Sequence, residues 1–171
     1  MNDRMTLFSP CRKYRYTLWR EWGTLPGDDD LFAPRKSGLR RGQYVQFIGL
    51  NPSTADETND DPTIRRCINF AKDWGFGALC MTNLFAFRAT QPSDMMKEPE
   101  PVGPDNDTHL QLIAKKAGLV IAAWGTLGNH RGRADQVRSA IPNLHAIGLS
   151  REGFPRHPLY VAGHAIPQIY E

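Results

Sequence analysis

The stretch that decides the fold lies at residues 44–53 and reads YVQFIGLNPS. Its first seven residues are mostly apolar, which is typical of a strand buried on both faces within a parallel sheet. The Asn-Pro pair that follows favours a turn. We therefore expect a strand over residues 44–50 that is followed at once by a loop at its carboxyl end.

An amphipathic helix is expected after this loop. Asp61 is a good N-cap, and Pro62 suits the first helical position. Apolar residues then recur with helical spacing, at Ile64, Cys67, Ile68, Ala71 and Trp74. Gly75 and Gly77 mark the end of the helix.

The same alternation of strand and helix continues along the chain. We expect further strands over residues 78–84, 118–124 and 144–149, and further helices over 104–117 and around 134–141. Each connection is long enough for a crossover. The pattern therefore predicts an α/β fold in three layers, with a central, mostly parallel four-stranded sheet and helices on both faces.

Residues 13–20 alternate between apolar and polar side chains, with Tyr14, Tyr16 and Leu18 on one face. This period predicts an additional strand, added as an antiparallel edge of the sheet. Residues 23–42 and 89–103 are expected to be long loops because they are rich in glycine, proline and polar side chains.

Composition limits the class of protein. The chain has 171 residues, of which 40% are hydrophobic and 23% charged, so we expect one globular domain over residues 1–171. A net charge of +3 permits a nucleic-acid partner without requiring one. The sequence shows no membrane span and no signal segment, which predicts a cytoplasmic protein with no membrane partner. No obligate protein partner is evident.

The predicted topology also gives a map of the functional site. In an open parallel sheet, ligands bind beyond the carboxyl ends of the strands. Asn51, Asn83, Trp124 and His157 are expected to gather along that edge. Two amides, an aromatic ring and an imidazole suit a neutral, planar, hydrogen-bonding ligand such as a nucleobase. Each residue also has a structural interpretation, as a turn residue, a loop stabiliser, a core side chain or a surface histidine.

Several other chemistries lose support. The sequence contains no GxxxxGK[ST], GxGxxG or GxSxG motif, which disfavours nucleoside triphosphate cleavage, dinucleotide redox chemistry and acyl transfer at a nucleophile elbow. The three cysteines and the remaining histidines lack the spacing of metal ligands. The acidic stretch 56–61 does not match an EF-hand. We expect no cofactor and no metal.

Three short strings together resemble the uracil-DNA glycosylase superfamily in the same chain order, at residues 49–53 (GLNPS), 81–84 (MTNL) and 156–160 (RHPLY). Residues 47–55 (FIGLNPSTA), 61–67 (DPTIRRC) and 155–160 (PRHPLY) are still closer to a bacterial and phage family filed as a domain of unknown function. That family is similar in fold to these glycosylases. One of its branches excises heavily modified bases, such as glucosylated hydroxymethylcytosine, from phage DNA as a defence.

The resemblance implies a role for each strand-end residue. Asn51 would orient the attacking water, since an amide cannot act as a general base. Asn83 would read the Watson–Crick edge of the flipped base, and His157 would stabilise the departing base anion. The chain departs from the superfamily at RHPLY, which replaces a His-Pro-Ser-Pro run, and at Pro52 and Ser53, which replace the residue that screens pyrimidine size.

From these residues we expect a monofunctional DNA glycosylase that flips a modified pyrimidine and leaves an abasic site, with modified phage DNA as its partner. Without a lysine at a strand end, direct attack by water is favoured over a Schiff base. Two alternatives stay open: an enzyme acting on free modified nucleosides or nucleotides, and a non-catalytic binder of modified nucleic acid.

Further side chains are expected to bind the substrate. Phe85 is the candidate for stacking on the base, and Pro52 and Ser53 are expected to line the pocket. The acidic loop is expected to accept hydrogen bonds from sugar hydroxyls through Asp56, Thr58, Asn59 and Asp60. Phosphate contacts are expected from Arg65, Arg66, Arg88 and Arg156.

Overall fold

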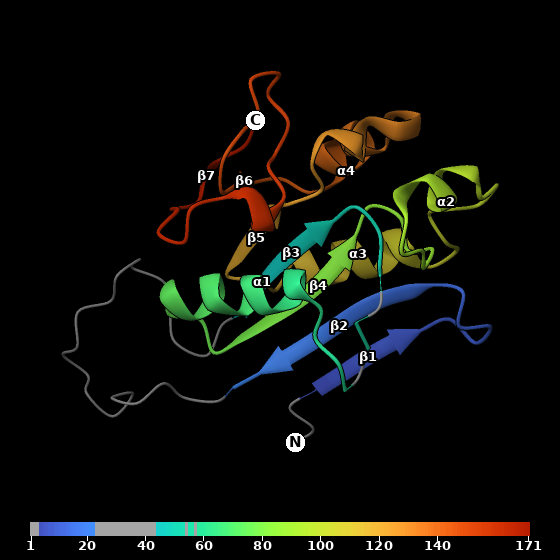
Figure 1. Cartoon of the computed structure of the whole chain (residues 1–171), viewed down its shortest axis with the longest axis horizontal. Coiled ribbons are helices and arrows are strands. Elements are labelled where there is room, and N and C mark those ends of the chain that lie inside the picture. Colours follow the sequence, from blue (N-terminus) through green and yellow to red (C-terminus); the bar gives the residue numbers. More distant parts are fainter. Residues whose placement is uncertain (1–3, 23–43, 54, 57) are drawn as a thin grey trace.

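The computed structural model describes residues 4–22, 44–53, 55–56 and 58–171. Within these residues seven strands form one sheet in the order β1-β2-β4-β3-β5-β6-β7 (Figure 1). The strands are β1 (Arg4–Phe8), β2 (Arg15–Glu21), β3 (Tyr44–Gly49), β4 (Ala78–Asn83), β5 (Leu119–Ala122), β6 (Leu144–Ala146) and β7 (Gln168–Ile169).

The sheet is mixed. Strands β4, β3, β5 and β6 pair in parallel at its centre. Strands β1 and β2 extend it antiparallel on one side, and β7 extends it antiparallel on the other. The prediction of a mostly parallel sheet is therefore confirmed only in part, because half of the strand pairings are antiparallel. Strand β2 is antiparallel as expected, but the sequence does not predict the outer strands β1 and β7.

Four α-helices and two 3-10 turns complete the described fold: α1 (Pro62–Asp73), α2 (Pro92–Lys97), α3 (Asn106–Ala114), α4 (Arg133–Ala140), η1 (Thr126–Gly132) and η2 (Pro158–Tyr160). The three predicted helices are present, although α3 is shorter than expected. The predicted loop over 89–103 contains α2, and the predicted loop over 23–42 lies outside the described residues. No described helix combines the length and the apolar character needed to cross a membrane.

Helix α1 begins where the sequence predicts. The Asp61 side chain accepts a hydrogen bond from the backbone N–H of Ile64 at 2.9 Å, and Pro62 occupies the first turn. The apolar stripe of the helix then buries Ile64, Cys67, Phe70 and Ala71. This burial fixes the helix on the sheet, and the N-cap fixes where the preceding loop must end.

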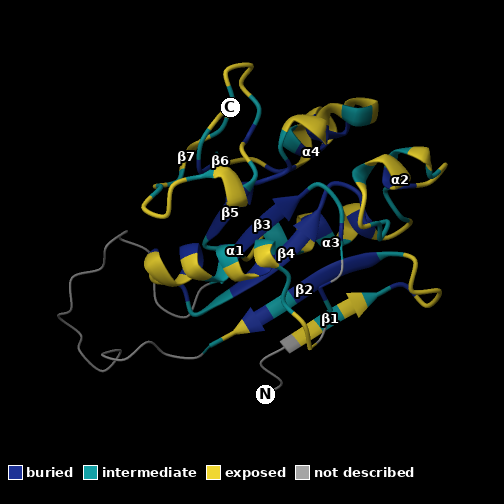
Figure 2. Cartoon of the chain, viewed as in Figure 1, coloured by how far each residue is buried: buried dark blue, intermediate teal, exposed yellow. Residues whose placement is uncertain are grey.

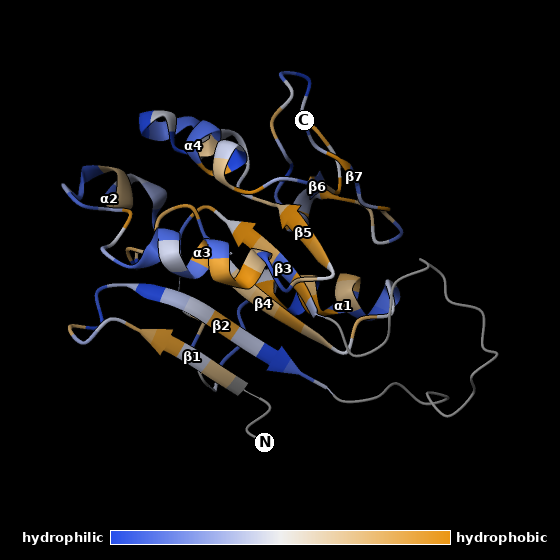
Figure 3. Ribbon diagram, turned by 180° about the vertical axis from the view of Figure 1, so that it is seen from behind, coloured by the Kyte–Doolittle hydropathy of each residue, from blue (hydrophilic) through white to orange (hydrophobic). Residues whose placement is uncertain are grey.

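The helices cover the sheet on both faces, which gives three layers (Figures 1 and 3). On the α1 face, the helix packs against Phe47, Met81 and Ile121 of the central strands. On the α3 face, α3 and α4 pack against Ile48, Val120 and Ala122. Figure 2 shows the central strands buried between helices whose outer sides are exposed.

Strand β2 differs from the half-exposed edge strand that its alternation predicts. Tyr16 and Leu18 are buried, as expected, but so are Arg15, Thr17 and Arg20. The reason is that β1 pairs outside β2, so β2 has a paired strand on each side, and Arg15 and Arg20 contact the loop that follows β3. Tyr16 stacks on His109 of α3, with ring centroids 5.0 Å apart.

Candidate functional site

The loop after β3 and the segment after β4 are joined by backbone hydrogen bonds at the carboxyl edge of the sheet. The N–H groups of Leu84 and Phe85 donate to the carbonyls of Gly49 and Leu50 at 2.8 and 3.0 Å. The Ala89 N–H donates to the Pro52 carbonyl at 3.0 Å. These bonds continue the β3–β4 pairing beyond the strands and make one firm support for the side chains that follow.

Asn51 reinforces this support through its side chain. Its Nδ2 donates to the carbonyls of Ala89 at 2.8 Å and Pro52 at 3.1 Å. Because only the NH2 group of an amide can donate to carbonyls, these contacts fix the orientation of the amide. Among the described residues none donates to Oδ1, so this oxygen is the acceptor that Asn51 keeps for another partner.

Asn83 ends β4 on the α1 face. It shares this face with Leu79 and Met81 because side chains two residues apart in a strand point the same way. Only 2% of Asn83 is exposed, and its buried Nδ2 has no hydrogen-bond partner among the described residues. Its Oδ1 lies where a side chain on Gly49 would be, since a Cβ there would be 2.8 Å away. Glycine at position 49 therefore makes room for the amide.

Two buried polar side chains hold the end of β4 in place. Nδ2 of Asn106, on α3, donates at 3.0 Å to the carbonyls of both Asn83 and Leu84. Nε of Arg133, on α4, donates to the Leu84 carbonyl at 2.9 Å, and its guanidinium also pairs with Asp107. Sequence reasoning missed both residues, because one lies in a helix start and the other in a basic cluster that looked solvent-exposed.

His157 lies beside the start of α1. It is half-buried, and desolvation lowers its pKa while the nearby Asp61 carboxylate acts in the opposite direction. Its Nδ1 accepts a hydrogen bond from the Leu159 N–H at 3.3 Å. A neutral ring in this arrangement carries its proton on Nε2, where it can donate to a ligand.

Trp124 and Phe85 belong to the other face. Both are buried in the core of the α3 face, and Phe85 has no exposed surface. The Phe85 ring packs near His130, with centroids 5.6 Å apart. The expectation that Phe85 stacks on a base therefore finds no support in the structure, because the ring is covered by its neighbours. Trp124 is likewise a core residue, which is the structural interpretation of its position, and it lies on the opposite face of the sheet from the Asn83 amide.

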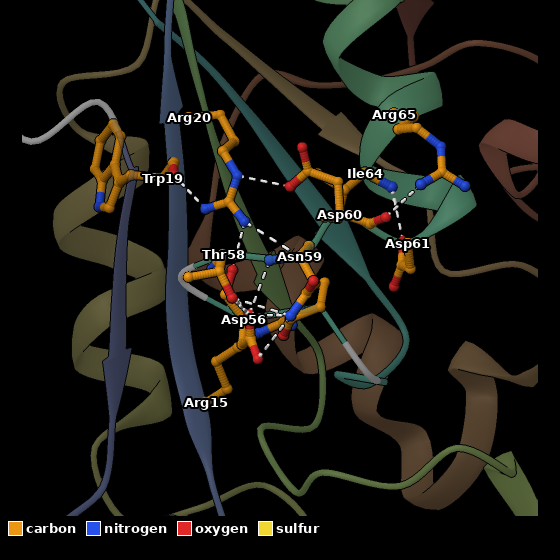
Figure 4. A network of polar contacts seen from close by, with 11 residues as sticks. Arg15, Trp19, Arg20, Asp56, Thr58, Asn59, Asp60, Asp61, Ile64 and Arg65 are labelled. Atoms are coloured by element: carbon orange, nitrogen blue, oxygen red, sulfur yellow. Dashed lines mark hydrogen bonds and ion pairs between the residues drawn. The ribbon is translucent and has the colours of Figure 1, made fainter.

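The acidic loop is bound to β2 by two buried arginines (Figure 4). Arg20 pairs with Asp60 at 2.7 Å and donates to the carbonyl of Asp56. Arg15 donates to the carbonyl of Ala55 at 2.6 Å, and burial lowers its pKa to about 10. The positive charges of these two side chains compensate the acidic residues that would otherwise repel a nucleic acid.

The carboxylates of this loop are used internally. Oδ1 of Asp56 accepts from the backbone and side chains of Thr58 and Asn59, and these hydrogen bonds lower its pKa to about 2. Asp60 is occupied by Arg20. The expectation that Asp56 and Asp60 accept sugar hydroxyls is thus in conflict with the contacts they already make. The side chains of Thr58 and Asn59 also take part in this cluster, although both residues are exposed.

The four arginines predicted to contact phosphates divide into two groups. Arg66 is half-buried and holds the C-terminal segment on α1, donating to the carbonyls of Val161 and Pro158. Arg65 donates to the carbonyl of Asp60, and Arg156 to that of Leu149 at 3.2 Å, but both are exposed. Arg88 lines a cleft with Ser53. Arg66 is therefore structural, and the other three remain accessible.

Asn51, Asn83 and His157 thus lie at the carboxyl edge, on segments that border the loop from Asn51 to Asp61. Asn51 and Asn83 share the β3–β4 support, and His157 neighbours Asp61 at the other end of the loop. Among the described residues, no group of three His, Cys, Asp or Glu side chains is placed to hold a metal ion. Two amides and a neutral imidazole can orient water and donate to a developing anion.

The chain matches one protein-family model over residues 15–159, which is most of its length. The chain belongs to this family. It is described as a protein of unknown function, DUF1643, and the match carries no link to the uracil-DNA glycosylase superfamily. The search of the curated proteins and the search of the solved structures each gave no match.

Proposed function

We propose that this protein hydrolyses the N-glycosidic bond of a modified pyrimidine in DNA and leaves an abasic site. The observation that carries the proposal is the amide of Asn83, buried at the carboxyl end of β4 with Nδ2 unpartnered. Leaving such a donor unsatisfied costs about 1–3 kcal/mol. A ligand carbonyl would remove this cost, and a pyrimidine edge provides one.

The other two side chains supply what glycosidic hydrolysis requires. The reaction breaks the bond between C1′ of the sugar and the base nitrogen, leaves the electron pair on the base, and forms a bond between C1′ and a water oxygen. Oδ1 of Asn51 is the acceptor that would align this water, while Nε2–H of His157 would donate to the base as it becomes an anion. The water supplies the hydroxyl on C1′ and the proton that finally neutralises the base.

The protonation state of His157 suits this role. A cationic ring would bind the base anion well, but it would also cost more to hold in a partly buried site. Desolvation lowers the pKa of His157 below the ordinary histidine value of 6.5, so the ring is neutral at neutral pH. The neutral ring still donates through Nε2, so the site is competent at neutral pH.

The arrangement of the sheet is consistent with this activity. A central group of parallel strands with helices on both faces, together with the order of the three motifs, supports a uracil-DNA glycosylase-like arrangement. The preference for a hydroxyl-bearing modification now depends on the exposed Asn59, whose Oδ1 accepts no hydrogen bond from a described residue, rather than on the neighbouring carboxylates. Phage defence is the biological setting that the family resemblance supports.

The test incubates the protein with phage DNAs that carry different modified bases and then detects abasic sites by alkaline strand cleavage. We expect at least one modified DNA to be cleaved, and His157→Gln to lower the rate by about 10²–10³. His164→Gln, an exposed histidine of the same C-terminal segment, is the matched control and should keep the wild-type rate.

Two other results would replace the proposal with its alternatives. Release of bases from free nucleosides, with no cleavage of any DNA, would indicate an enzyme of nucleoside metabolism. Tight binding of modified DNA without abasic sites would indicate a non-catalytic binder.

A further inference from the structure

We infer that a basic cleft beside Asn51 binds a phosphoryl anion. The cleft has a volume of about 550 Å³ and is lined by Arg12, Lys13, Ser53, Arg88 and Glu98, among others. This inference deepens the proposed function, on which its interpretation as a nucleotide subsite rests.

Four separate segments build the cleft. The turn between β1 and β2 contributes Arg12 and Lys13, and the segment after β4 contributes Arg88. The loop after β3 contributes Ser53, and the end of α2 contributes Glu98. The Arg88 N–H donates to the Lys13 carbonyl at 2.9 Å, which joins the turn to the segment. Arg12 adopts a positive φ of 57°, a conformation that the tight turn imposes.

The cleft concentrates positive charge. The guanidinium carbons of Arg12 and Arg88 lie 4.0 and 4.7 Å from the centre of the same Phe8 ring. The two like charges are therefore closer than the Debye length of ~10 Å at 0.1 M salt, so they repel each other. Among the lining residues that the structure describes, Glu98 is the one carboxylate, against three cationic side chains. An anion in the cleft would relieve this repulsion.

Arg88 has donors left for such an anion. Its Nη1 donates to the Arg12 carbonyl at 3.3 Å, while its buried Nε has no partner among the described residues. No described residue accepts from Nη2. A planar guanidinium suits phosphate, because it can give two parallel charge-assisted hydrogen bonds. Ser53, on the loop after β3, also lines the cleft and adds a hydroxyl donor.

The cleft adjoins the proposed reaction site. Ala89 lines it, and the Ala89 carbonyl accepts the hydrogen bond from Asn51 Nδ2 at 2.8 Å. Ser53 is two residues beyond Asn51. A phosphoryl group bound here would thus be held next to a nucleotide whose base reaches Asn83. The same chemistry is offered by the backbone of a DNA strand and by the phosphate of a free nucleotide.

The experiment measures binding and needs no catalysis. A fluorescent, unmodified dT oligonucleotide is titrated at several salt concentrations, and thymidine 5′-monophosphate and thymidine are titrated separately. The test variants are Arg12→Asn, because asparagine tolerates the positive φ, and Lys13→Gln. The control is Lys116→Gln, at an exposed residue between α3 and β5. Each test variant should reduce the slope of log K against log salt by about 0.7.

A variant of opposite sign separates binding from folding. Glu98→Gln removes the carboxylate that opposes an anion, so it should tighten oligonucleotide binding several-fold. Loss of fold cannot produce this gain. Unchanged affinity and slope in all three cleft variants would overturn the inference.

The binding measurements identify the source of the anion, and the abasic-site assay tests the proposed function separately. A strand backbone is the source if the oligonucleotide binds and the monophosphate does not, and a free nucleotide is the source if the monophosphate binds and thymidine does not. If these binding effects appear but no DNA yields abasic sites, the anion site stands and the proposed function fails. If abasic sites form while the cleft variants bind normally, the proposed function stands and the anion site fails.

Discussion

Each face of the sheet holds, at the same carboxyl edge, a buried donor that has no partner among the residues described, yet the surroundings of the two donors differ. On the α1 face it is Nδ2 of Asn83, and on the α3 face it is Nε1 of Trp124. The amide of Asn83 lies beside Gly49, near the loop that carries Asn51. The Trp124 indole lies directly beneath Gly128, where a Cβ would be 2.1 Å from its ring.

This difference shows why an unsatisfied donor alone does not mark a site. An indole is a donor only, and that of Trp124 is packed among aliphatic and aromatic side chains of the α3 core. An amide offers a donor and an acceptor together, which is the pattern that a base edge can match. We therefore place the function on the α1 face and expect the α3 face to contribute stability.

The largest effect should come from the α3 face. Phe85→Ala removes a fully buried ring, so the free energy of unfolding should fall by about 3–5 kcal/mol. Urea denaturation followed by circular dichroism measures this loss. Leu127→Ala, on an exposed side chain of η1, should change stability little. A loss below 1 kcal/mol for Phe85→Ala would show that this face is not the packed one.

The next effect concerns the acidic loop of the α1 face. Arg20→Met breaks the buried ion pair with Asp60 and removes the donors to the loop carbonyls, which should cost about 3 kcal/mol. Arg138→Met removes the exposed pair with Asp135 and should cost under about 1 kcal/mol. Equal losses in the two variants would mean that the loop does not depend on β2.

A smaller effect is expected at the start of α1. Asp61→Ala removes the N-cap hydrogen bond to Ile64 and should lower stability by about 1 kcal/mol. Asp73→Ala, at the end of the same helix, removes a charge that the helix dipole disfavours and should be neutral or slightly stabilising. Thermal unfolding of both variants distinguishes the loss of the N-cap hydrogen bond from a general effect of removing a negative charge.

The smallest effect is a dependence on pH. The folded-state pKa of Asp56 is about 2, below its ordinary value of 3.8, so its contribution to stability is present above pH 3.8 and is lost as the pH falls toward 2. Asp56→Asn lacks this contribution, so the stability gap between wild type and variant should narrow over that interval. A gap that stays constant from pH 5 to pH 2 would contradict the hydrogen bonding of this carboxylate.

The central fold could be predicted because its strands and helices have strong local signals. Residues 44–50 form a short, mostly apolar run that is typical of a buried strand, and Asp61 with Pro62 defines the start of α1. The outer strands β1 and β7 carry no such signal, since β1 exposes Met5 and Leu7 and β7 has two residues. Their pairing is decided by tertiary contacts.

The site could be predicted only in part, for a similar reason. Strand-end positions place Asn51 and Asn83 at one edge, but local sequence does not show which face a residue beyond the strand occupies. Phe85 was assigned to the ligand although it belongs to the core. Asn106 and Arg133 were missed because their partners are backbone carbonyls, which no side-chain pattern reveals.

The most direct test of the account compares Asn83→Leu with Trp124→Phe. Each variant removes one buried donor that has no partner within the described part of the chain and leaves an apolar side chain in its place, so the two faces are compared by the same kind of change. Base release from the modified DNA that the wild type cleaves is measured for both, with unfolding followed in urea. The account predicts that Asn83→Leu folds with unchanged or greater stability and loses base release, while Trp124→Phe keeps it. Wild-type base release by Asn83→Leu would contradict the account.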